Sequence, residues 1–438
     1  MNPARRAART VRVLYTAAVI YLGYKWTGLR NRADPANAAA RTSGQHLGSA
    51  RRFLGMATSV RGLMIKAGQV MGARADLFPD EYVDVLSKLH DDLPPRPFRE
   101  IRRVVDAELG RPLEQVFAEF EPKPVASASL AQVHRARLGD GRQVAVKVQY
   151  PDIEEIVKID LRNIRLIARA ANRLILREID LKSFVAELEY AASQELDFVQ
   201  EGHNAERMAR DFRATPSIVV PSIAWEHTSR RLLVMNFVDG VKATDAVALK
   251  ERGVTPTQVM DLVIDAYMRQ ILINGFFHGD PHPGNIFVQP GPRLVLLDFG
   301  LCKELSADFR RAHVQLTWAM VSGDRVAIGD ALRAIGFETR DDDPSALERV
   351  GELFARRMSD PATPNRDLTR RMNTEMMAIV KANPVVRIPA DFLLIGRVMG
   401  LISGLGAQLK VPLDVSQSMG IYAAQAQADL SRPAALPA

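Results

Sequence analysis

The spacing of hydrophobic and polar residues changes along the chain, and each change predicts a different kind of structure. Residues 46–92 are mostly helical in pattern, and 98–119 hold two further short helical stretches. Two short segments, 124–136 and 143–149, are instead rich in β-branched residues. Gly139-Asp140-Gly141 lies between them and is a hairpin turn signal. We therefore expect a helical extension that is followed by a β-hairpin.

The helical pattern returns after the hairpin and dominates the rest of the chain. Short strands are predicted at Ile218–Val220, Leu232–Val238 and Leu294–Leu297. Helices are predicted over 153–179, 181–208, 255–275 and 306–410. Together these elements predict an α+β protein with a helical extension, a mixed lobe and a mainly helical lobe.

The first 45 residues combine positive charge with a short apolar run from Val13 to Tyr24. The run is too short to cross a bilayer, which needs about 20 apolar residues. Its basic flanks and its aromatic residues favour a helix lying on an anionic membrane surface. A helix docked on the protein and a signal peptide are the alternatives, although no small-residue cleavage site follows. Residues 28–45, which contain Asp34-Pro35, predict a linker.

Composition limits the class of protein. The 438 residues are 47% hydrophobic, enough for two lobes with large buried cores. The net charge of +7 favours anionic partners such as nucleotides or acidic lipid surfaces, and no basic run is dense enough to indicate nucleic acid. The single cysteine, Cys302, excludes an intramolecular disulfide framework and a cysteine-rich zinc site.

Two aspartates and an asparagine form the most informative pattern in the chain. The run His278–Asn285 reads His-Gly-Asp-Pro-His-Pro-Gly-Asn, and Asp298-Phe299-Gly300 follows a short predicted strand. Phosphoryl transfer from a nucleotide needs this set, because one carboxylate orients or deprotonates the acceptor while an amide and a second carboxylate hold Mg²⁺. Asp280, Asn285 and Asp298 would take these roles. Alternatively, both aspartates are turn residues that cap neighbouring elements.

A lysine and an unusual loop precede this segment. Lys147 ends the run Val-Ala-Val-Lys on the second strand of the hairpin, where it could reach the phosphates of a nucleotide. Its acidic partner is expected on the helical region that begins at Leu181. The preceding Ala126-Ser127-Ala128-Ser129 has no glycine, although phosphate-covering loops usually need it. It is either an altered phosphate loop or a plain strand that makes no nucleotide contact.

These motifs together resemble the UbiB/AarF/ADCK family of atypical kinases, which is linked to quinone biosynthesis. Lys66-Ala67-Gly68-Gln69 matches the family's K-x-G-Q element, and Ala126–Ser129 matches the alanine-rich loop that replaces glycines. Glu195-Leu196-Asp197 matches its E-x-D element, and His278–Asn285 has the family's own spelling. The likeness covers about residues 46–410.

The resemblance implies a two-lobed protein-kinase-like fold of the α+β class with an N-terminal helical extension. The implied parts are an N-terminal segment with linker (1–45), the K-x-G-Q extension (46–119), the N-lobe (120–238), the C-lobe (239–410) and a tail (411–438).

The resemblance also implies a role for each matched residue. Lys147 would bind phosphate with Glu201 as its helix partner, and Asp280 would be the catalytic-loop carboxylate. Asn285 and Asp298 would hold magnesium. The remaining nucleotide-site residues would be the loop residues Ala126, Ser127, Ala128 and Ser129, the hinge residues Asn236, Phe237 and Val238, and Lys66 and Gln69 with the carboxylates Glu195 and Asp197.

The family further implies an ATPase that binds ATP or ADP with Mg²⁺ and supports isoprenoid quinone biosynthesis of the ubiquinone type, by handling membrane lipid intermediates. A small-molecule or lipid kinase and a nucleotide-gated lipid-binding protein without turnover are the alternatives. Expected partners are an anionic membrane surface, a quinone-like lipid and quinone-biosynthesis proteins, with an oligomer possible and no nucleic acid. The expected location is the cytoplasm, peripheral to the inner membrane through the N-terminal segment.

Three glycines recur every fourth residue near the end of the chain. Gly396, Gly400 and Gly404 lie in an apolar stretch and would let helices approach closely, in a membrane or in a soluble core. Asp391 and Arg397 interrupt the stretch, and a charge in lipid is costly, which favours a buried soluble helix.

Overall fold

The computed structural model describes most of the chain as two compact units. Described are residues 2–73, 78–87, 89, 94–174, 181–339, 347–349, 351, 385–412 and 416–430. Unit 1 comprises Met1–Gly202 and Ile223–Phe237, and unit 2 comprises His203–Ser222 and Val238–Ala438. The chain thus passes from unit 1 into unit 2 between Phe237 and Val238, at the predicted hinge.

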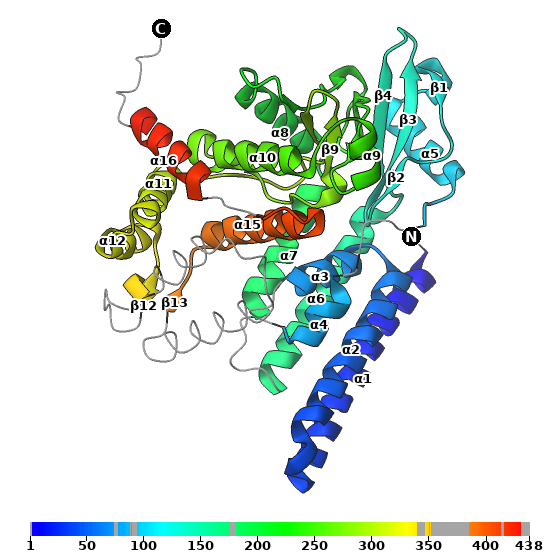
Figure 1. Cartoon of the computed structure of the whole chain (residues 1–438). Helices are drawn as coiled ribbons and strands as arrows, with labels where there is room; N and C mark the ends of the chain where they lie inside the picture. The colour runs from blue at the N-terminus through cyan, green and yellow to red at the C-terminus, as the bar shows by residue number, and fades with distance from the viewer. Residues whose placement is uncertain are drawn as a thin grey trace. The chain divides into compact units, whose positions relative to one another are not determined.

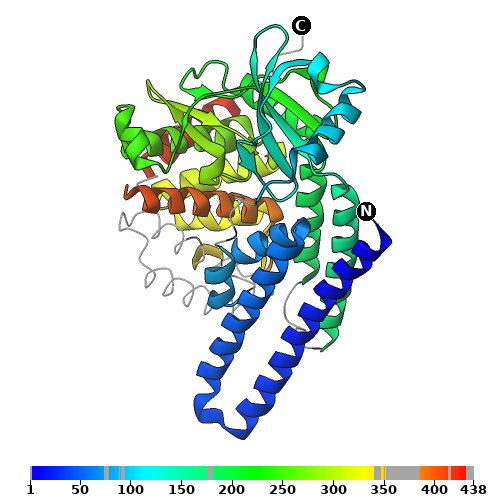
Figure 2. The same ribbon diagram turned by 90° about the vertical axis from the view of Figure 1, so that its right-hand side faces the viewer.

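Unit 1 begins with a helical hairpin. Helix α1 (Pro3–Ala33) lies beside α2 (Ala38–Val60), and a 3₁₀ turn over Pro35–Asn37 joins them (Figures 1 and 2). The linker expected at 28–45 is therefore wrong except at this turn. Packing of α1 on α2 stabilises both helices on either side of the turn. Arg41 Nη1 donates to Asp34 Oδ2 at 2.8 Å and helps to close the turn.

Helix α1 is docked on unit 1 through its inner face. Val13 and Thr16 are buried, and α1 packs against both α2 and α6 (Ile153–Leu174). Its outer face exposes five large apolar side chains: Val11, Tyr15, Leu22, Trp26 and Leu29. The docked-helix interpretation thus holds for one face, and the other face is an apolar surface without a described partner.

Three further helices complete the extension, namely α3 (Leu63–Ala73), α4 (Asp80–Leu86) and α5 (Phe98–Leu109). A Cβ atom on Gly68 would lie 2.3 Å from a methyl carbon of Leu89, and one on Gly72 would lie 2.7 Å from the backbone nitrogen of Ser87. Gly72 is therefore needed for the close approach of α3 to the backbone after α4, and Gly68, the glycine of the K-x-G-Q element, leaves room for the Leu89 side chain.

The sheet of unit 1 has the strand order β1-β3-β4-β6, with β2 paired to β3. These strands are β1 (Phe117–Phe120), β2 (Ala126–Ser127), β3 (Ala131–Leu138), β4 (Gln143–Gln149) and β6 (Leu232–Asn236). The predicted hairpin is confirmed as the antiparallel pair β3–β4. The strand β1 was missed, because residues 98–119 were expected to be helical. On β4, the side chains of Val144, Val146 and Val148 alternate into the core.

Helices follow this hairpin as predicted. Residues 153–179 give α6, and residues 181–208 give α7 (Leu181–Glu195) and α8 (Phe198–Asp211). The short strand β5 (Ile218–Val219) then pairs in parallel with β10 (Arg293–Leu296). This pairing explains why His203–Ser222 belongs to unit 2, although the sequence places it in the N-lobe.

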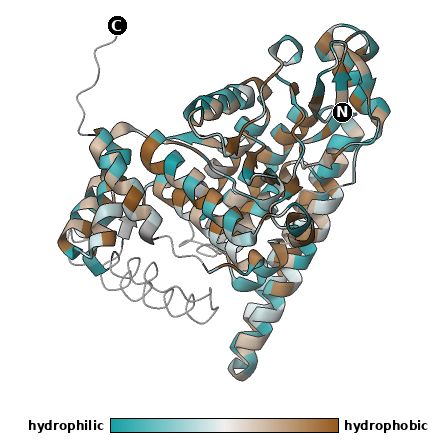
Figure 3. Cartoon of the chain, turned by 45° about the horizontal axis from the view of Figure 1, so that its top comes forward, coloured by the Kyte–Doolittle hydropathy of each residue, from teal (hydrophilic) through white to brown (hydrophobic). Residues whose placement is uncertain are grey.

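Unit 2 surrounds residues 278–300, which include the predicted catalytic loop, with small sheets and helices. One sheet has the order β5-β10-β9-β7, and β11 pairs with β8. The strands are β7 (Val241–Lys242), β8 (Phe276–His278), β9 (Ile286–Gln289) and β11 (Cys302–Glu304). Between β7 and β8 lie α9 (Ala246–Glu251) and α10 (Pro256–Met268), and α10 continues as a π-helix over Arg269–Asn274. Buried hydrophobic residues of unit 2 lie on β9 and β10, namely Ile286, Val288, Leu294, Val295 and Leu296, and Figure 3 marks hydrophobic positions along the ribbon in brown.

The rest of unit 2 is mainly helical, as predicted for the part of 306–410 that the structure describes. The elements are α11 (Ala307–Ser322), α12 (Arg325–Ile335), β12 (Glu338–Thr339), β13 (Val385–Arg387), α15 (Ala390–Leu409) and α16 (Ser416–Leu430). Helix α16, within the predicted tail, packs on α11. Most of residues 340–384 lie outside the described part.

Helix α15 carries the three regularly spaced glycines. Among the described helices it is the one long and apolar enough to cross a membrane by length and composition. Asp391 Oδ1 lies 3.0 Å from Lys303 Nζ, and Arg397 pairs with Asp280. These ion pairs attach α15 to the rest of unit 2, although only 33% of its most apolar window is buried.

Candidate functional site

The predicted site residues form two sets, one in each unit. In unit 1, Lys147 Nζ donates to Oε1 of Glu201 at 2.7 Å. On β4 the lysine side chain points to the opposite face of the sheet from its valine neighbours, and the first turn of α8 carries the glutamate. The Glu201 side chain is only 1% exposed, and the Phe198 ring lies 5.2 Å from the ammonium group. A buried carboxylate thus fixes the direction of a strand-borne cation.

The alanine-rich loop is held by a tyrosine that the sequence analysis did not identify. Tyr150 Oη donates to the backbone oxygen of Ala128 at 3.1 Å, so the Ser127 hydroxyl, 2.8 Å away, donates to Tyr150. Ser127 and Ser129 are buried, whereas Ala126 is exposed on β2. Burial raises the pKa of Tyr150, which keeps its hydroxyl protonated as a donor. The loop is therefore restrained although it lacks glycine.

The K-x-G-Q and E-x-D elements meet through one ion pair. Lys66 of α3 pairs with Glu195 at the end of α7, as the resemblance implied. Gln69 donates to the backbone oxygen of Leu89 at 3.3 Å and so also holds the segment after α4.

Asp197 has a structural role at the start of α8. Its Oδ1 accepts from the backbone N–H groups of Val199 and Gln200, both at 3.1 Å. This carboxylate caps the first turn of the helix that carries Glu201. Asp197 therefore positions the partner of Lys147, a role that the motif alone did not indicate.

The hinge residues lie at the end of β6. Asn236 is opposite Val144 in the sheet, and the Phe237 N–H donates to the backbone oxygen of Gln143 at 2.9 Å. The sheet therefore uses the N–H of Phe237, and this donor is not available to a ligand. Val238 is the first residue of unit 2 after the crossing.

In unit 2, the buried His278 connects the two acidic motifs. Its Nδ1 accepts from the backbone N–H of Asp280 at 3.2 Å, and its Nε2 contacts the backbone oxygen of Asp298. Because a carbonyl only accepts, the proton of the neutral ring is on Nε2. Tyr267 also contacts Nδ1, and burial together with the charge of Asp280 raises the pKa of Tyr267. One imidazole thus sets the spacing of both motifs.

Asp298 has a strained backbone. Its φ is +59°, in the left-handed region that residues other than glycine rarely adopt, and its Oδ1 accepts from the Gly300 N–H at 3.3 Å. Asn204 of α8 donates to the Phe299 oxygen at 2.9 Å, and the Phe299 side chain is buried. Several contacts hold this conformation, and such strain often lies at functional sites.

Asn285 is oriented for an oxygen-ligand role. Its Nδ2 donates to the backbone oxygen of Asp280 at 3.2 Å, which leaves the amide oxygen as the end that can bind a cation. Together with the Asp298 carboxylate it offers oxygen donors that suit Mg²⁺, which usually takes one or two protein ligands with substrate phosphates. Among the described residues, no group of three or more His, Cys, Asp or Glu is placed to hold a metal ion.

Two basic residues make ion pairs around residues 278–300 that the sequence did not predict. Arg397 Nη2 lies 3.7 Å from Asp280 Oδ1, and Lys303 pairs with Asp391. Arg397 and Asp391, the two partners that lie on α15, were noted in the sequence only as interruptions of an apolar stretch. A charged residue in an apolar helix is costly without a partner, and this could have indicated that Asp391 and Arg397 form ion pairs.

Comparisons with known proteins identify the family to which the chain belongs. A model described as the ABC1 atypical kinase-like domain matches residues 88–332. An uncharacterized protein of Synechocystis sp., sll0005, is 31% identical over 92% of this chain and 58% of its own length. "Protein ACTIVITY OF BC1 COMPLEX KINASE 7, chloroplastic" from Arabidopsis thaliana is 34% identical over 78% of this chain and 49% of its own length.

Another relative is "AarF domain-containing protein kinase 1" of Xenopus tropicalis, which is 36% identical over 72% of this chain and 61% of its own length. The chain thus spans about half to three fifths of the curated relatives it matches.

Among solved structures, the complex of Rv3197 with erythromycin from Mycobacterium tuberculosis has a TM-score of 0.60 at 24% identity, and covers 86% of this chain and 97% of that one. The likeness shows the same fold, an α+β kinase-like fold with an N-terminal helical segment. By the matched domain and these relatives, the chain belongs to the UbiB/AarF/ADCK family of ABC1 atypical kinases.

Proposed function

We propose that this protein is an atypical kinase-like ATPase that binds ATP or ADP with Mg²⁺. The observation that supports this best is the Lys147–Glu201 pair, at 2.7 Å with its carboxylate buried. Burying the Glu201 carboxylate is costly, because a charge loses its water. We explain this cost by a function of Lys147, whose ammonium group the carboxylate holds in place and which remains partly accessible. Phosphate binding is the function that fits a strand-borne lysine in this family.

Each remaining residue has a proposed role. Lys147 would contact the α and β phosphates, and Asn285 and Asp298 would hold Mg²⁺, which would neutralise the phosphate charge when bound. Asp280 would orient the attacking water or hydroxyl group. Ser127 and Ala128 would cover the phosphates.

The hinge and the extension would complete the nucleotide site. Because the sheet uses the N–H of Phe237, adenine would meet the other backbone groups of the hinge residues Asn236, Phe237 and Val238. Lys66, paired with Glu195, would keep the extension close to the nucleotide. Such an extension would exclude peptide substrates, so that water or a small acceptor would take the phosphoryl group.

We further propose that the exposed face of α1 lies on an anionic membrane. Val11, Tyr15, Leu22, Trp26 and Leu29 follow one another at intervals of three, four or seven residues, and so share one helix face. Three basic residues flank this stripe: Arg12, Lys25 and Arg30. An apolar stripe with basic edges is typical of an interfacial helix.

At the membrane the ATPase would support isoprenoid quinone biosynthesis by handling lipid intermediates. Moving an isoprenoid tail out of the bilayer is unfavourable, at ~0.8 kcal/mol for each CH₂ exposed to water. Nucleotide turnover by a membrane-bound protein could offset this cost. The proposal rests on the family and on the α1 surface.

The test is ATP turnover by the purified chain with Mg²⁺, alone and with vesicles of neutral or anionic lipid. We expect turnover that needs Mg²⁺, is lost in Lys147→Met, and rises with anionic vesicles. Absence of nucleotide binding in a properly folded chain would refute the ATPase proposal. Phosphate transfer to a lipid extract, detected by mass spectrometry, would instead favour the lipid-kinase alternative.

The quinone proposal needs a test in cells. Deleting the gene should lower the isoprenoid quinone content, and wild-type protein but not Asp298→Asn should restore it. Full restoration by Asp298→Asn would favour the nucleotide-gated binding protein, whereas an unchanged quinone content would refute the role in quinone biosynthesis.

A further inference from the structure

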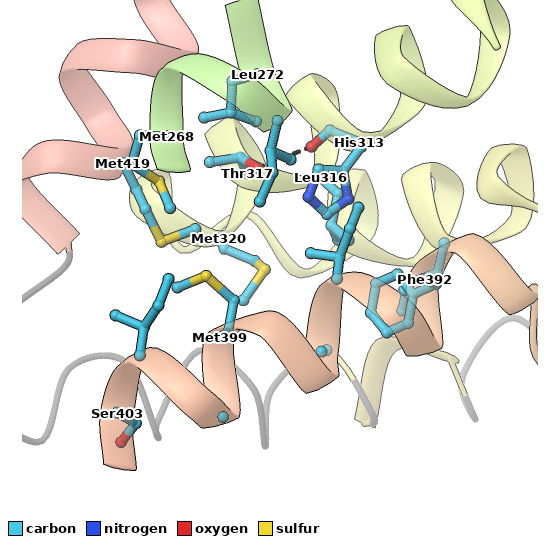
Figure 4. Close-up of a pocket in the computed structure, with 17 residues that line it drawn as sticks. Met268, Leu272, His313, Leu316, Thr317, Met320, Phe392, Met399, Ser403 and Met419 are labelled. Atoms are coloured by element: carbon cyan, nitrogen blue, oxygen red, sulfur yellow. Dashed lines mark hydrogen bonds between the residues drawn. The ribbon is translucent and has the colours of Figure 1, made fainter. Parts of the chain in front are cut away.

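Unit 2 contains a cavity that is separate from the catalytic residues. Its volume is about 310 Å³, and helices α10, α11, α15 and α16 and the π-helix supply most of its lining. The side chains of Met268, Met320, Met399 and Met419 point toward the same space (Figure 4). Such a lining is apolar and deformable, because methionine is flexible and its sulfur is polarisable. The cavity is therefore suited to an apolar molecule.

One residue of this lining, His313, has a ring nitrogen that lacks a partner. Nδ1 of His313 is closed off from water and has no hydrogen-bond partner among the described residues. The ring is stacked on Phe309 and meets the edge of Phe392, at centroid distances of 6.0 and 6.2 Å. Burial lowers the pKa of His313 to about 4, so the ring is neutral and one of its nitrogens can accept a hydrogen bond.

Water is a poor occupant for this cavity. A buried water needs two to four polar partners. The hydroxyl of Thr317 is already engaged, since it donates to the backbone oxygen of His313 at 2.8 Å. Apart from His313, the main polar side chain in the lining is Ser403, which Figure 4 shows on α15 away from the ring. A single molecule that is apolar except for one donor fits the lining better.

The volume of the cavity and the room along its wall indicate how large this molecule is. A cavity of ~150 Å³ can hold benzene, so about twice that volume suits a bicyclic ring system. On α15, Cβ atoms added at Gly396 and Gly400 would meet nothing within 4 Å. These glycines leave room along the helix. Methionine sulfur atoms also contact aromatic rings favourably, which favours an aromatic occupant over an aliphatic one.

We propose that this cavity binds a small aromatic molecule that donates one hydrogen bond to a ring nitrogen of His313. The site uses none of the nucleotide-site residues, and binding at it does not depend on the proposed ATPase activity. It is a preformed ligand site in the helical part of unit 2, with methionine walls and one hydrogen-bond acceptor that selects the ligand.

Two matched probes test the proposal by isothermal titration of the full chain. Indole has an N–H donor, and 1-methylindole has the same rings without it. Wild-type protein should bind indole about tenfold more tightly, as expected for one buried hydrogen bond. His313→Leu should remove this preference. His313→Asn should keep it, because the amide oxygen can take the place of the accepting ring nitrogen.

A second variant tests the location without changing the histidine. Gly400→Leu should fill the cavity from α15 and weaken binding of both probes at least tenfold, while its circular dichroism spectrum and melting temperature show that it is folded. Equal affinity of wild-type protein for the two probes would overturn the hydrogen bond to His313. Unchanged binding by folded Gly400→Leu would overturn the cavity as the site.

Discussion

The guanidinium group of Arg397 lies 3.7 Å from Oδ1 of Asp280. The arginine comes from α15, which follows the residues 88–332 that match the kinase-like domain. The contact fixes the side chain that is proposed to orient the attacking group. A C-terminal helix is therefore part of the environment of the proposed catalytic loop.

We expect Arg397→Met to lower kcat for ATP hydrolysis by about tenfold or more, because small displacements of a positioned group are costly in rate. The KM for ATP should change little, since Arg397 is not among the proposed nucleotide ligands. Arg397→Lys should recover part of kcat, because it restores the charge but not the planar geometry. Steady-state kinetics at saturating Mg²⁺ measures both constants.

Lys303→Met is the control for Arg397, because it removes the other ion pair of α15, with Asp391, without touching Asp280. If both variants lower kcat equally, the effect comes from loosening of α15. If Arg397→Met leaves kcat unchanged, the arginine does not position Asp280.

The Lys147–Glu201 pair separates stability from activity. Lys147→Met should abolish turnover and also destabilise unit 1 by about 3–5 kcal/mol, because a buried carboxylate is left without this cation. The double variant Lys147→Met/Glu201→Gln should regain most of the stability and none of the activity. Chemical denaturation and ATPase assays on the same samples measure the two effects. Recovery of activity in the double variant would contradict the role of Lys147.

Substitution of His278 should disturb Asp280 and Asp298 together, because the imidazole contacts both. His278→Phe keeps a buried ring but removes both hydrogen bonds, to Asp280 and to Asp298. Leaving buried polar groups unpaired costs about 1–3 kcal/mol each, so we expect a lower melting temperature and a loss of Mg²⁺-dependent ADP binding. Titration of ADP with and without Mg²⁺ tests this. A variant that binds Mg²⁺-ADP normally would show that the imidazole is only a packing element.

The sequence could predict the residues whose spacing is local, and it failed where long-range contacts decide. Asp280, Asn285 and Asp298 lie in short motifs, and Lys147 lies on a recognisable strand, so these residues could be named in advance. Arg397 could not, because its contact with Asp280 forms only when α15 packs on the catalytic segment. Tyr150 holds the alanine-rich loop through its hydroxyl group, and no pattern marks it.

The fold shows the same limit. Helices with strong periodicity and the β3–β4 hairpin follow from local preferences. The linker expected at 28–45 is mostly helical because α1 and α2 stabilise each other by packing, and tertiary packing commonly overrides local signals. The strand β1 was missed because its pairing with β3 is not visible in a short segment.

The low pKa of His313, about 4, predicts a pH effect on stability. The unfolded chain takes up a proton near pH 6.5, whereas the folded ring stays neutral down to about pH 4. The unfolded state therefore binds more protons in this window, and stability must fall as the pH falls from 6.5 toward 4. His313→Leu should lack this contribution. Urea midpoints of both proteins at several pH values measure the difference, and parallel pH profiles would contradict the prediction.

The last prediction concerns how α1 is held on unit 1. Arg9 donates to both carboxylate oxygens of Asp160 at 2.6 Å, and to the backbone oxygens of Val60 and Arg61 at 2.5 and 2.7 Å. Asp160 is buried, and burial raises the pKa of its carboxyl group while Arg9 lowers it. Arg9 therefore joins α1 to α6 and to the end of α2.

Arg9→Met should expose α1 to protease and to hydrogen exchange, because it leaves a buried charge without its cation, at a cost of about 3–5 kcal/mol. The loss should be greatest at neutral pH. It should shrink as the pH falls, since without Arg9 the pKa of Asp160 rises further and the group becomes neutral. Arg12→Met on the exposed side of the same helix is the matched control and should change neither measurement. If α1 resists protease and hydrogen exchange equally well in both variants at pH 7, the Arg9–Asp160 pair does not hold the helix. Apolar packing of α1 on α2 is then sufficient.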